Sequence, residues 1–263
     1  MDGIADYTFV RDLGEAGNGR LYLANTPARL HLETEYVGVK VIGGATDEDA
    51  LRRATRELRA FAAVSSPYLV KLLDAGRDGS SFFYAMEHCP GGSLESPSGH
   101  LDRGERLAAV ARAARGAHAL HEAGLVHRGI NPTNILLADD GAKLADLGLA
   151  LQPEASMSGL GPMANVEYVD PNVLAGRPVT SAADIWSLGL TLHRVVTGEG
   201  VYGDLPLHDP LLAVRRLLST TPKISPELAP RAAELVRDCM ASAPEDRPAS
   251  ALVVAERIEE LAG

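Results

Sequence analysis

Two side chains in the middle of the chain carry short oxygen ligands that could bind a divalent cation. Asn134 and Asp146 are twelve residues apart, and their positions predict two adjoining turns. Amide and carboxylate oxygens are ligands of the kind that Mg²⁺ takes up together with substrate phosphates. These two residues therefore indicate a site for a phosphate-bound Mg²⁺.

A glycine-rich segment near the amino terminus could hold the phosphates themselves. Residues 13–21 read L-G-E-A-G-N-G-R-L and lie between two predicted strands. Closely spaced glycines let backbone N–H groups approach a phosphate without interference from a Cβ atom. Taken alone, the segment is equally well explained as a glycine-rich hairpin without a ligand.

Lys40 adds a cation that could contact a phosphate. It ends the run V-G-V-K in a predicted strand, and Glu57 follows 17 residues later in a predicted helix. A lysine that faces the interior needs a partner, because an unpaired buried charge is costly. We therefore expect Glu57 to hold Lys40 in place.

The elements that must position these residues change in kind along the chain. The amino-terminal part predicts strands and one helix, and the part after the Pro-Gly-Gly-Ser break at 90–93 predicts helices. The predicted strands are 7–13, 20–25, 36–42, 69–76 and 81–87, and the first helix is 50–63. The later predicted helices are 103–123, 185–197, 211–218, 230–240 and 249–261, with a long loop over 149–166.

The run H-R-G-I-N-P-T-N at 127–134, followed by D-L-G at 146–148, completes a recognisable order of motifs. Together with the glycine-rich loop, the strand lysine and the helix glutamate, it resembles the eukaryotic-type Ser/Thr protein kinases over essentially the whole chain. Residues 86–89, 184–189 and 246–248 agree with that resemblance. It implies an α+β, two-lobed fold with a β-rich N-lobe (1–88), a hinge (87–92) and a helical C-lobe (93–263).

The resemblance also implies ATP and Mg²⁺ as ligands and assigns the residues that would bind them. The residues matching catalytic positions are Lys40, Glu57 and Asp146, and those matching metal ligands are Asn134 and Asp146. The residues matching nucleotide-binding positions are Gly14, Ala16, Gly17, Gly19, Leu21, Gly38, Lys40, Met86, Glu87, Cys89 and Leu136.

The chain departs from the family pattern at the phosphoacceptor end of the site. Gly129 replaces the catalytic Asp, and Asn131 replaces the phosphate-facing Lys. Asn165 stands where an activation-segment Thr is usual, counting back from D-P-N at 170–172, which occupies the Ala-Pro-Glu position. Asn172 also removes the charge expected to pair with Arg247.

Smaller departures lie at the nucleotide end. Ala16 replaces the second glycine of the loop, and Asn18 replaces its usual aromatic tip. Gly38 stands where an Ala usually packs on adenine, which leaves room for about one methyl group. The nucleotide ligands themselves are retained.

Because the losses share one end of the site, the sequence favours a pseudokinase that binds nucleotide and acts as a switch or scaffold for protein partners. One alternative is a weakly active Ser/Thr protein kinase, since phosphoryl transfer depends mainly on positioning and metal electrostatics. Another is a structural module that binds no nucleotide. Residues 184–189 and 246–248 disfavour a small-molecule phosphotransferase, because they resemble the protein-kinase C-lobe.

Composition narrows the remaining possibilities. The chain has 25 Lys and Arg against 35 Asp and Glu, a net charge of −10, which disfavours nucleic-acid and anionic-membrane binding. Two cysteines are too few for a disulfide framework, and no apolar run approaches the ~20 residues that span a bilayer. We expect a cytoplasmic protein or the cytosolic domain of a larger or membrane-anchored one.

Several residues that could suggest further chemistry are interpreted as structural. His127 is the His-Arg turn residue, which the resemblance places in the core. His118 and His121 lie on an Ala-rich predicted helix with no Cys or carboxylate set to complete a metal site. Cys89 has no neighbour in the sequence that would lower its pKa, so we expect an unreactive thiol. Ser156 and Ser158 are expected to be ordinary loop residues.

Overall fold

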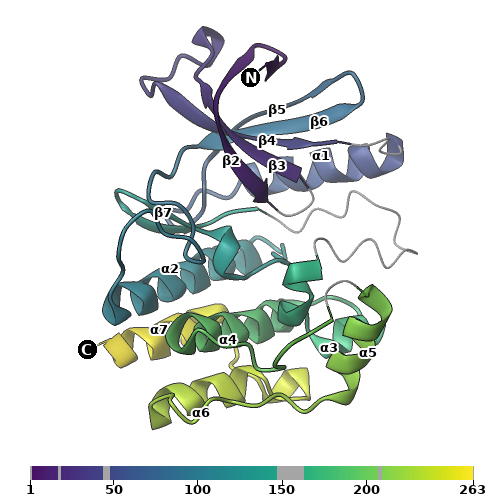
Figure 1. Cartoon of the computed structure of the whole chain (residues 1–263), viewed down its shortest axis with the longest axis vertical. Helices are drawn as coiled ribbons and strands as arrows, with labels where there is room; N and C mark the ends of the chain where they lie inside the picture. Colours follow the sequence, from purple (N-terminus) through teal and green to yellow (C-terminus); the bar gives the residue numbers. More distant parts are fainter. Residues whose placement is uncertain (1, 17–18, 44–47, 147–162, 207–208, 263) are drawn as a thin grey trace.

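The amino-terminal part of the chain is a curled antiparallel sheet, and the carboxy-terminal part is built mainly of helices (Figure 1). The computed structural model describes residues 2–16, 19–43, 48–146, 163–206 and 209–262. Within these ranges six strands form one sheet in the order β1-β2-β3-β4-β6-β5. Their bounds are β1 Gly3–Ile4, β2 Tyr7–Ala16, β3 Gly19–Asn25, β4 Tyr36–Ile42, β5 Leu72–Asp78 and β6 Ser81–Glu87.

The two faces of β4 and β6 serve different purposes. Val37 and Val39 alternate onto the outer face, where they join a cluster with Phe83. Helix α1 (Glu48–Ala62) covers the inner face, where its Leu58 packs in one cluster with Tyr84. Alternation therefore places Lys40 on the inner face, toward the carboxy-terminal part.

Helix α4 (Ser181–Thr197) is the centre of the carboxy-terminal part. Most of its residues are buried, which is typical of a helix enclosed on all sides. Helix α2 (Arg103–Glu122) begins with a capping box formed by Asp102 and Glu105 and packs against α4 and α7. The other helices are α3 Pro171–Leu174, α5 Pro210–Ser219, α6 Pro230–Cys239 and α7 Ala251–Ala262.

The other described elements are short. The hairpin of β7 (Ile135–Ala138) and β8 (Gly141–Leu144) follows the 3-10 turn η2 (Pro132–Asn134). Among the described residues, further 3-10 segments are η1 Ala28–Leu30, η4 Met163–Tyr168 and η5 Pro244–Asp246. In the described part of the chain, no helix is both long and apolar enough to cross a bilayer.

The two-lobed kinase fold is confirmed, while several element bounds differ from the prediction. Helix α4 begins at Ser181, four residues before 185, because its first turn, S-A-A-D, lacks the large apolar residues from which the helix was predicted. Strand β5 begins at Leu72 rather than 69, and the β7–β8 hairpin was not predicted. Most of the predicted 149–166 loop lies outside the described residues. The domain limits at 88 and 93 stay predictions.

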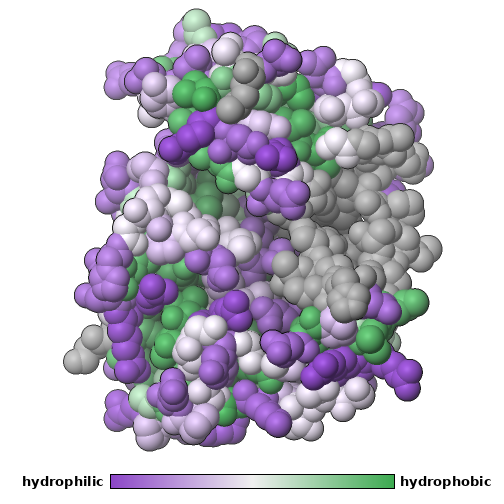
Figure 2. All heavy atoms as spheres, in the orientation of Figure 1, coloured by the Kyte–Doolittle hydropathy of each residue, from purple (hydrophilic) through white to green (hydrophobic). Residues whose placement is uncertain are grey.

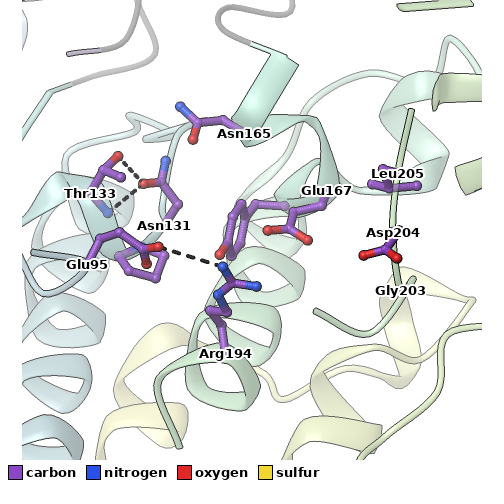
Figure 3. A pocket seen from close by; sticks show the side chains of 11 residues that line it. Glu95, Asn131, Thr133, Asn165, Glu167, Arg194, Gly203, Asp204 and Leu205 are labelled. Atoms are coloured by element: carbon purple, nitrogen blue, oxygen red, sulfur yellow. Dashed lines mark hydrogen bonds and ion pairs between the residues drawn. The ribbon is translucent and has the colours of Figure 1, made fainter. Parts of the chain in front are cut away.

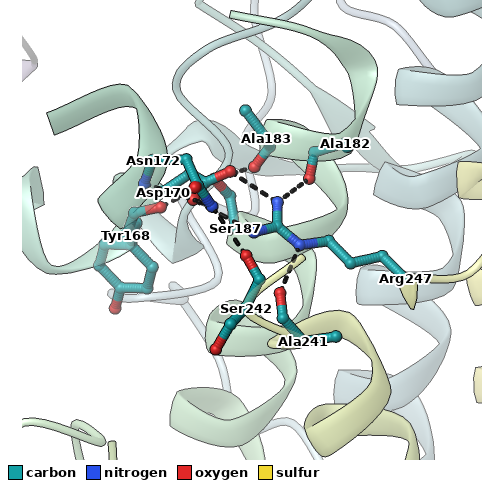
Figure 4. Close-up of polar contacts among 9 residues, drawn as sticks. All are labelled: Tyr168, Asp170, Asn172, Ala182, Ala183, Ser187, Ala241, Ser242 and Arg247. Carbon is teal, nitrogen blue, oxygen red and sulfur yellow. Dashed lines mark hydrogen bonds and ion pairs between the residues drawn. The ribbon is translucent and has the colours of Figure 1, made fainter. Parts of the chain in front are cut away.

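Asn172 supplies no charge to Arg247, as its residue type predicts, but another residue takes over that role (Figure 4). Asp170 supplies the carboxylate, with Arg247 Nη1 2.6 Å from Oδ2 and Nη2 3.2 Å from Oδ1. Both side chains are buried, and the Arg247 guanidinium also donates to the carbonyl oxygens of Ala182 and Ala241. The ion pair is therefore built with a carboxylate two residues earlier in the chain.

Removing the carboxylate of this buried pair should destabilise the fold strongly. We expect Asp170→Asn to lower the free energy of unfolding by about 3–5 kcal/mol, because it leaves the Arg247 charge buried and unpaired. Urea denaturation measures the change. The matched control is Asp238→Asn, which breaks a partly exposed 2.8 Å pair with Arg257 and should cost at most about 1 kcal/mol. Equal losses in the two variants would contradict the prediction.

Candidate functional site

Lys40 and Asp146 meet between the sheet and the helices as a buried ion pair. The Lys40 ammonium contacts Oδ2 of Asp146, and 2% of the lysine side chain and 13% of the aspartate side chain are exposed. Such a pair is tolerated in the interior only because each charge compensates the other. Two of the predicted catalytic residues are therefore brought together.

Glu57, the third predicted catalytic residue, contacts Arg128 rather than the expected Lys40. Its Oε1 lies 3.3 Å from Nη1 of Arg128, and both side chains are partly exposed. Because Asp146 already compensates the buried Lys40 charge, the glutamate is left to pair with a cation at the surface. The expected Lys40–Glu57 pair is not among the ion pairs of the described residues.

Tyr84 on β6 is a site residue that the sequence analysis missed. Its hydroxyl donates to Oδ1 of Asp146 at 2.7 Å. Burial and the adjacent carboxylate raise the pKa of Tyr84 well above its ordinary value, so the hydroxyl keeps its proton. Its spacing could have revealed it, since Tyr84 lies two residues before Met86 and thus on the same strand face.

The turn that carries Gly129 is fixed by a carboxylate from α4. Asp184 is fully buried and accepts hydrogen bonds from the backbone N–H groups of His127 (2.8 Å) and Arg128 (2.9 Å). It also lies 2.7 Å from Nε2 of His121. Arg128 has a positive φ of 65°, and the hydrogen bonds to Asp184 help to maintain this backbone conformation. His121 and His127 thus have structural contacts, as the sequence analysis expected.

A second set of bonds joins this turn to Asp146. His127 Nε2 lies 3.0 Å from the carbonyl oxygen of Ala145, and burial lowers the pKa of the ring. The backbone N–H of Ala145 donates to the carbonyl oxygen of Asn134 at 2.8 Å. Asn134 and Asp146 therefore lie on adjoining turns, and their oxygens form a donor set that fits Mg²⁺.

Gly129 leaves the position of the expected catalytic base without a side chain. Its carbonyl oxygen accepts from the side-chain amides of Asn131 (3.0 Å) and Asn134 (2.7 Å). Asn131 is buried, and its Oδ1 accepts from the backbone N–H and the hydroxyl of Thr133. Asn131 is thus engaged in holding the turn together rather than directed at a substrate.

A cavity of about 300 Å³ opens between the sheet and the β7 hairpin. Eight of the residues predicted to bind nucleotide or metal line it: Ala16, Leu21, Gly38, Met86, Glu87, Cys89, Asn134 and Leu136. Figure 2 shows the surface hollowed here, with hydrophobic atoms deep in the hollow. Leu13 and Glu15 of the predicted glycine-rich segment and His88, Pro90 and Gly92 of the predicted hinge also line the cavity. The wall further includes residues that were not predicted: Arg11, Ser93, Glu95, Ser96, Ser98 and Thr133.

The walls of this cavity agree with two details of the sequence analysis. A Cβ atom on Gly38 would lie 3.4 Å from Cγ of Met86, an ordinary contact, so there is room for one methyl group. Burial and the Glu87 carboxylate raise the pKa of the Cys89 thiol to about 12, so it is not a thiolate at neutral pH.

The other predicted residues that the structure describes are not among those that line the cavity. Gly14 has a positive φ of 101° on β2, and Gly19 begins β3. Lys40 and Asp146 contact each other and are not among the residues that line the cavity. Gly17 lies outside the described residues.

A second cavity, of about 320 Å³, lies at the phosphoacceptor end (Figure 3). Asn131 and Asn165 both line it, so two of the predicted losses face one space. The guanidinium of Arg194 reaches toward Glu95, with 3.7 Å between Nη2 and Oε1. Burial raises the pKa of Glu167, which lines the same cavity. The cavity is therefore polar, with carboxylates on either side of one arginine.

Comparisons with known proteins agree with the kinase resemblance that the sequence motifs indicated. The protein kinase domain model matches residues 7–258. Serine/threonine-protein kinase PknK of Mycobacterium bovis is 32% identical and matches 98% of this chain and 24% of its own length. PknL of Mycobacterium tuberculosis is 34% identical and matches 86% of this chain and 59% of its own length.

A solved structure covers the chain from end to end. A crystallised variant of the Mycobacterium tuberculosis PknI kinase domain has a TM-score of 0.75 and 29% identity, and the match covers 100% of this chain and 99% of that one. The chain spans between about a quarter and three fifths of the two curated relatives named above. With a family model matched over nearly all of its length, the chain belongs to the protein kinase family.

Proposed function

We propose that this chain binds ATP with Mg²⁺ between the sheet and the helices. The observation that carries the proposal is the cavity between Leu21, Met86 and Leu136, which has the apolar walls that a planar base requires. Asn134 belongs to the same wall, and the Lys40–Asp146 pair lies close by through the Ala145–Asn134 bond.

Each group in the site has a role in such binding. The Lys40 ammonium would neutralise phosphate charge, and the side-chain oxygens of Asn134 and Asp146 would hold Mg²⁺. The metal, when bound, neutralises the charge that develops on the transferred phosphate. The backbone of the hinge at 87–92 would hold the adenine, with Cys89 contributing a protonated thiol to the wall.

ATP with Mg²⁺ should raise the melting temperature of the protein. A ligand at 100 times its Kd stabilises the folded state by about 2.7 kcal/mol, which is about 5 °C for a domain of this size. Asp146→Asn should abolish the Mg²⁺-dependent part of the shift, because it removes one metal ligand. Differential scanning fluorimetry with ATP and either Mg²⁺ or EDTA measures both effects. No shift at millimolar ATP would favour a structural module that binds no nucleotide.

Two functions are compatible with this binding. The names of the curated relatives favour transfer of the γ-phosphoryl group to Ser or Thr of a protein. The absence of a side chain at Gly129 and the engagement of Asn131 favour a domain that binds nucleotide without efficient transfer. We infer a Ser/Thr kinase domain whose transfer is slowed at the acceptor end, because positioning a general base is worth roughly 10²–10⁴-fold.

The second candidate is a pseudokinase switch, in which nucleotide binding controls contacts with protein partners. It is favoured by the position of the main losses at the acceptor end, where Asn131 and Asn165 line one cavity. The net charge of −10 supports partners other than nucleic acid or anionic membranes. A cytoplasmic location belongs to this proposal as well.

Transfer to a protein substrate should be at least ~10²-fold slower than in a kinase that has the catalytic Asp. The measurement is steady-state transfer of ³²P from ATP to a generic Ser/Thr substrate, with Lys40→Ala as the blank. Signal above the blank at a low rate supports the slowed kinase, and no signal supports the switch. Rapid turnover that Lys40→Ala abolishes would refute the predicted role of Gly129.

Restoring the catalytic aspartate alone should recover little transfer. Groups that act as a unit are strongly non-additive, and Asn131 in its present place is bonded to Gly129 and Thr133. We expect Gly129→Asp to give little or no transfer, and Gly129→Asp with Asn131→Lys and Asn165→Thr to give measurable phosphorylation.

The control for the repaired variants is an unchanged melting shift with ATP and Mg²⁺, which shows that each variant still folds and binds. Near-normal turnover from Gly129→Asp alone would contradict the prediction. It would mean that the rest of the acceptor end is already organised for transfer.

A further inference from the structure

Side chains from two neighbouring strands contact the carboxylate of Asp146. Lys40 on β4 and Tyr84 on β6 are direct cross-strand partners, so their side chains leave the sheet side by side on one face. The ammonium of Lys40 contacts Oδ2 of Asp146, and the hydroxyl of Tyr84 donates to Oδ1 at 2.7 Å. Each oxygen of the carboxylate therefore has its own donor from the sheet.

The backbone conformation of Asp146 indicates that surrounding residues must hold it in place. Asp146 has a positive φ of 60°, a conformation that a non-glycine residue holds only when its surroundings impose it. It comes two residues after the end of β8, so the hairpin does not fix its side chain. Tyr84 is 1% exposed, and its hydroxyl donates to this carboxylate from a rigid position in the sheet.

We propose that Tyr84 is a positioning residue that orients Asp146 as a ligand for Mg²⁺, an inference that rests on the proposed binding of ATP with Mg²⁺. An ionised carboxylate has about four lone-pair sites on its two oxygens. Oδ1 can therefore accept from Tyr84 and keep a second site for a metal ion. The hydroxyl restricts rotation of the carboxylate, which lowers the cost of ordering it when the metal binds.

Hydrogen bonds of this kind have a known effect on metal binding. Groups that bond to a metal ligand typically change metal affinity by about 10–100-fold when they are removed. Apolar packing of the tyrosine ring predicts a different result, because Phe would fill the same space without the hydroxyl. The two roles are separated by the Mg²⁺ dependence of nucleotide binding.

The experiment compares Tyr84→Phe with a matched control in the same sheet. Tyr7 is also 1% exposed, and its hydroxyl also donates at 2.7 Å to an aspartate, Asp74, in the part of the chain outside the nucleotide cavity. Binding of a fluorescent ATP analogue is titrated with Mg²⁺ and, separately, in EDTA. Neither readout requires phosphoryl transfer.

We expect Tyr84→Phe to raise the Mg²⁺ concentration needed for half-maximal binding about 10-fold and to leave the affinity in EDTA unchanged. Tyr7→Phe should change neither value. Tyr84→Met, which lacks the hydroxyl and adapts to gaps in a core, should reproduce the Mg²⁺ effect if the Phe variant folds poorly.

Three results would overturn the inference. One is a Mg²⁺ dependence in Tyr84→Phe equal to that of the wild type, and another is an equal loss of affinity with and without Mg²⁺, which would indicate a structural role only. Binding by the wild-type protein with no Mg²⁺ dependence would remove the metal site and this inference with it. Loss of nucleotide binding by the wild type in every condition would instead refute the proposed function itself.

Discussion

The buried carboxylate of Asp184 is the constraint on which the candidate site depends. A fully buried carboxylate requires hydrogen-bond donors, and two of those that contact it are the backbone N–H groups of the turn at His127 and Arg128. The same residue, His127, reaches the carbonyl of Ala145, next to Asp146. One side chain on the central helix thereby fixes the turn that carries Gly129 and, through a single histidine, the segment that carries the proposed metal ligand.

Much of the fold and the spacing of the site residues along the chain could be predicted from the sequence, because both depend on local sequence patterns. The predicted strand at 36–42, which carries Lys40, and the predicted helix at 103–123 have bounds that hold within one residue. The proximity of Asn134 to Asp146 follows from their short separation along the chain. Local order of this kind depends on few distant contacts.

Charge pairing could not be predicted in the same way, because it is decided in three dimensions. Glu57 pairs with Arg128, Arg247 pairs with Asp170, and Tyr84 donates to Asp146, and each contact joins segments at least 60 residues apart. The family pattern supplied a partner for Lys40 and one for Arg247, and the structure supplies a different carboxylate in both cases. A buried cation needs a negative charge within reach, and any nearby element can provide it.

The displaced partner of Arg247 constrains how this segment can change over time. A return to the pattern of the family requires alanine at 170 and glutamate at 172, and neither step is neutral by itself. Changing Asp170 first leaves the Arg247 guanidinium buried without a charged partner. Introducing glutamate at Asn172 first places two carboxylates beside this one cation. The two positions are therefore energetically coupled, and each single substitution on the way to the family pattern is expected to lower the stability of the fold.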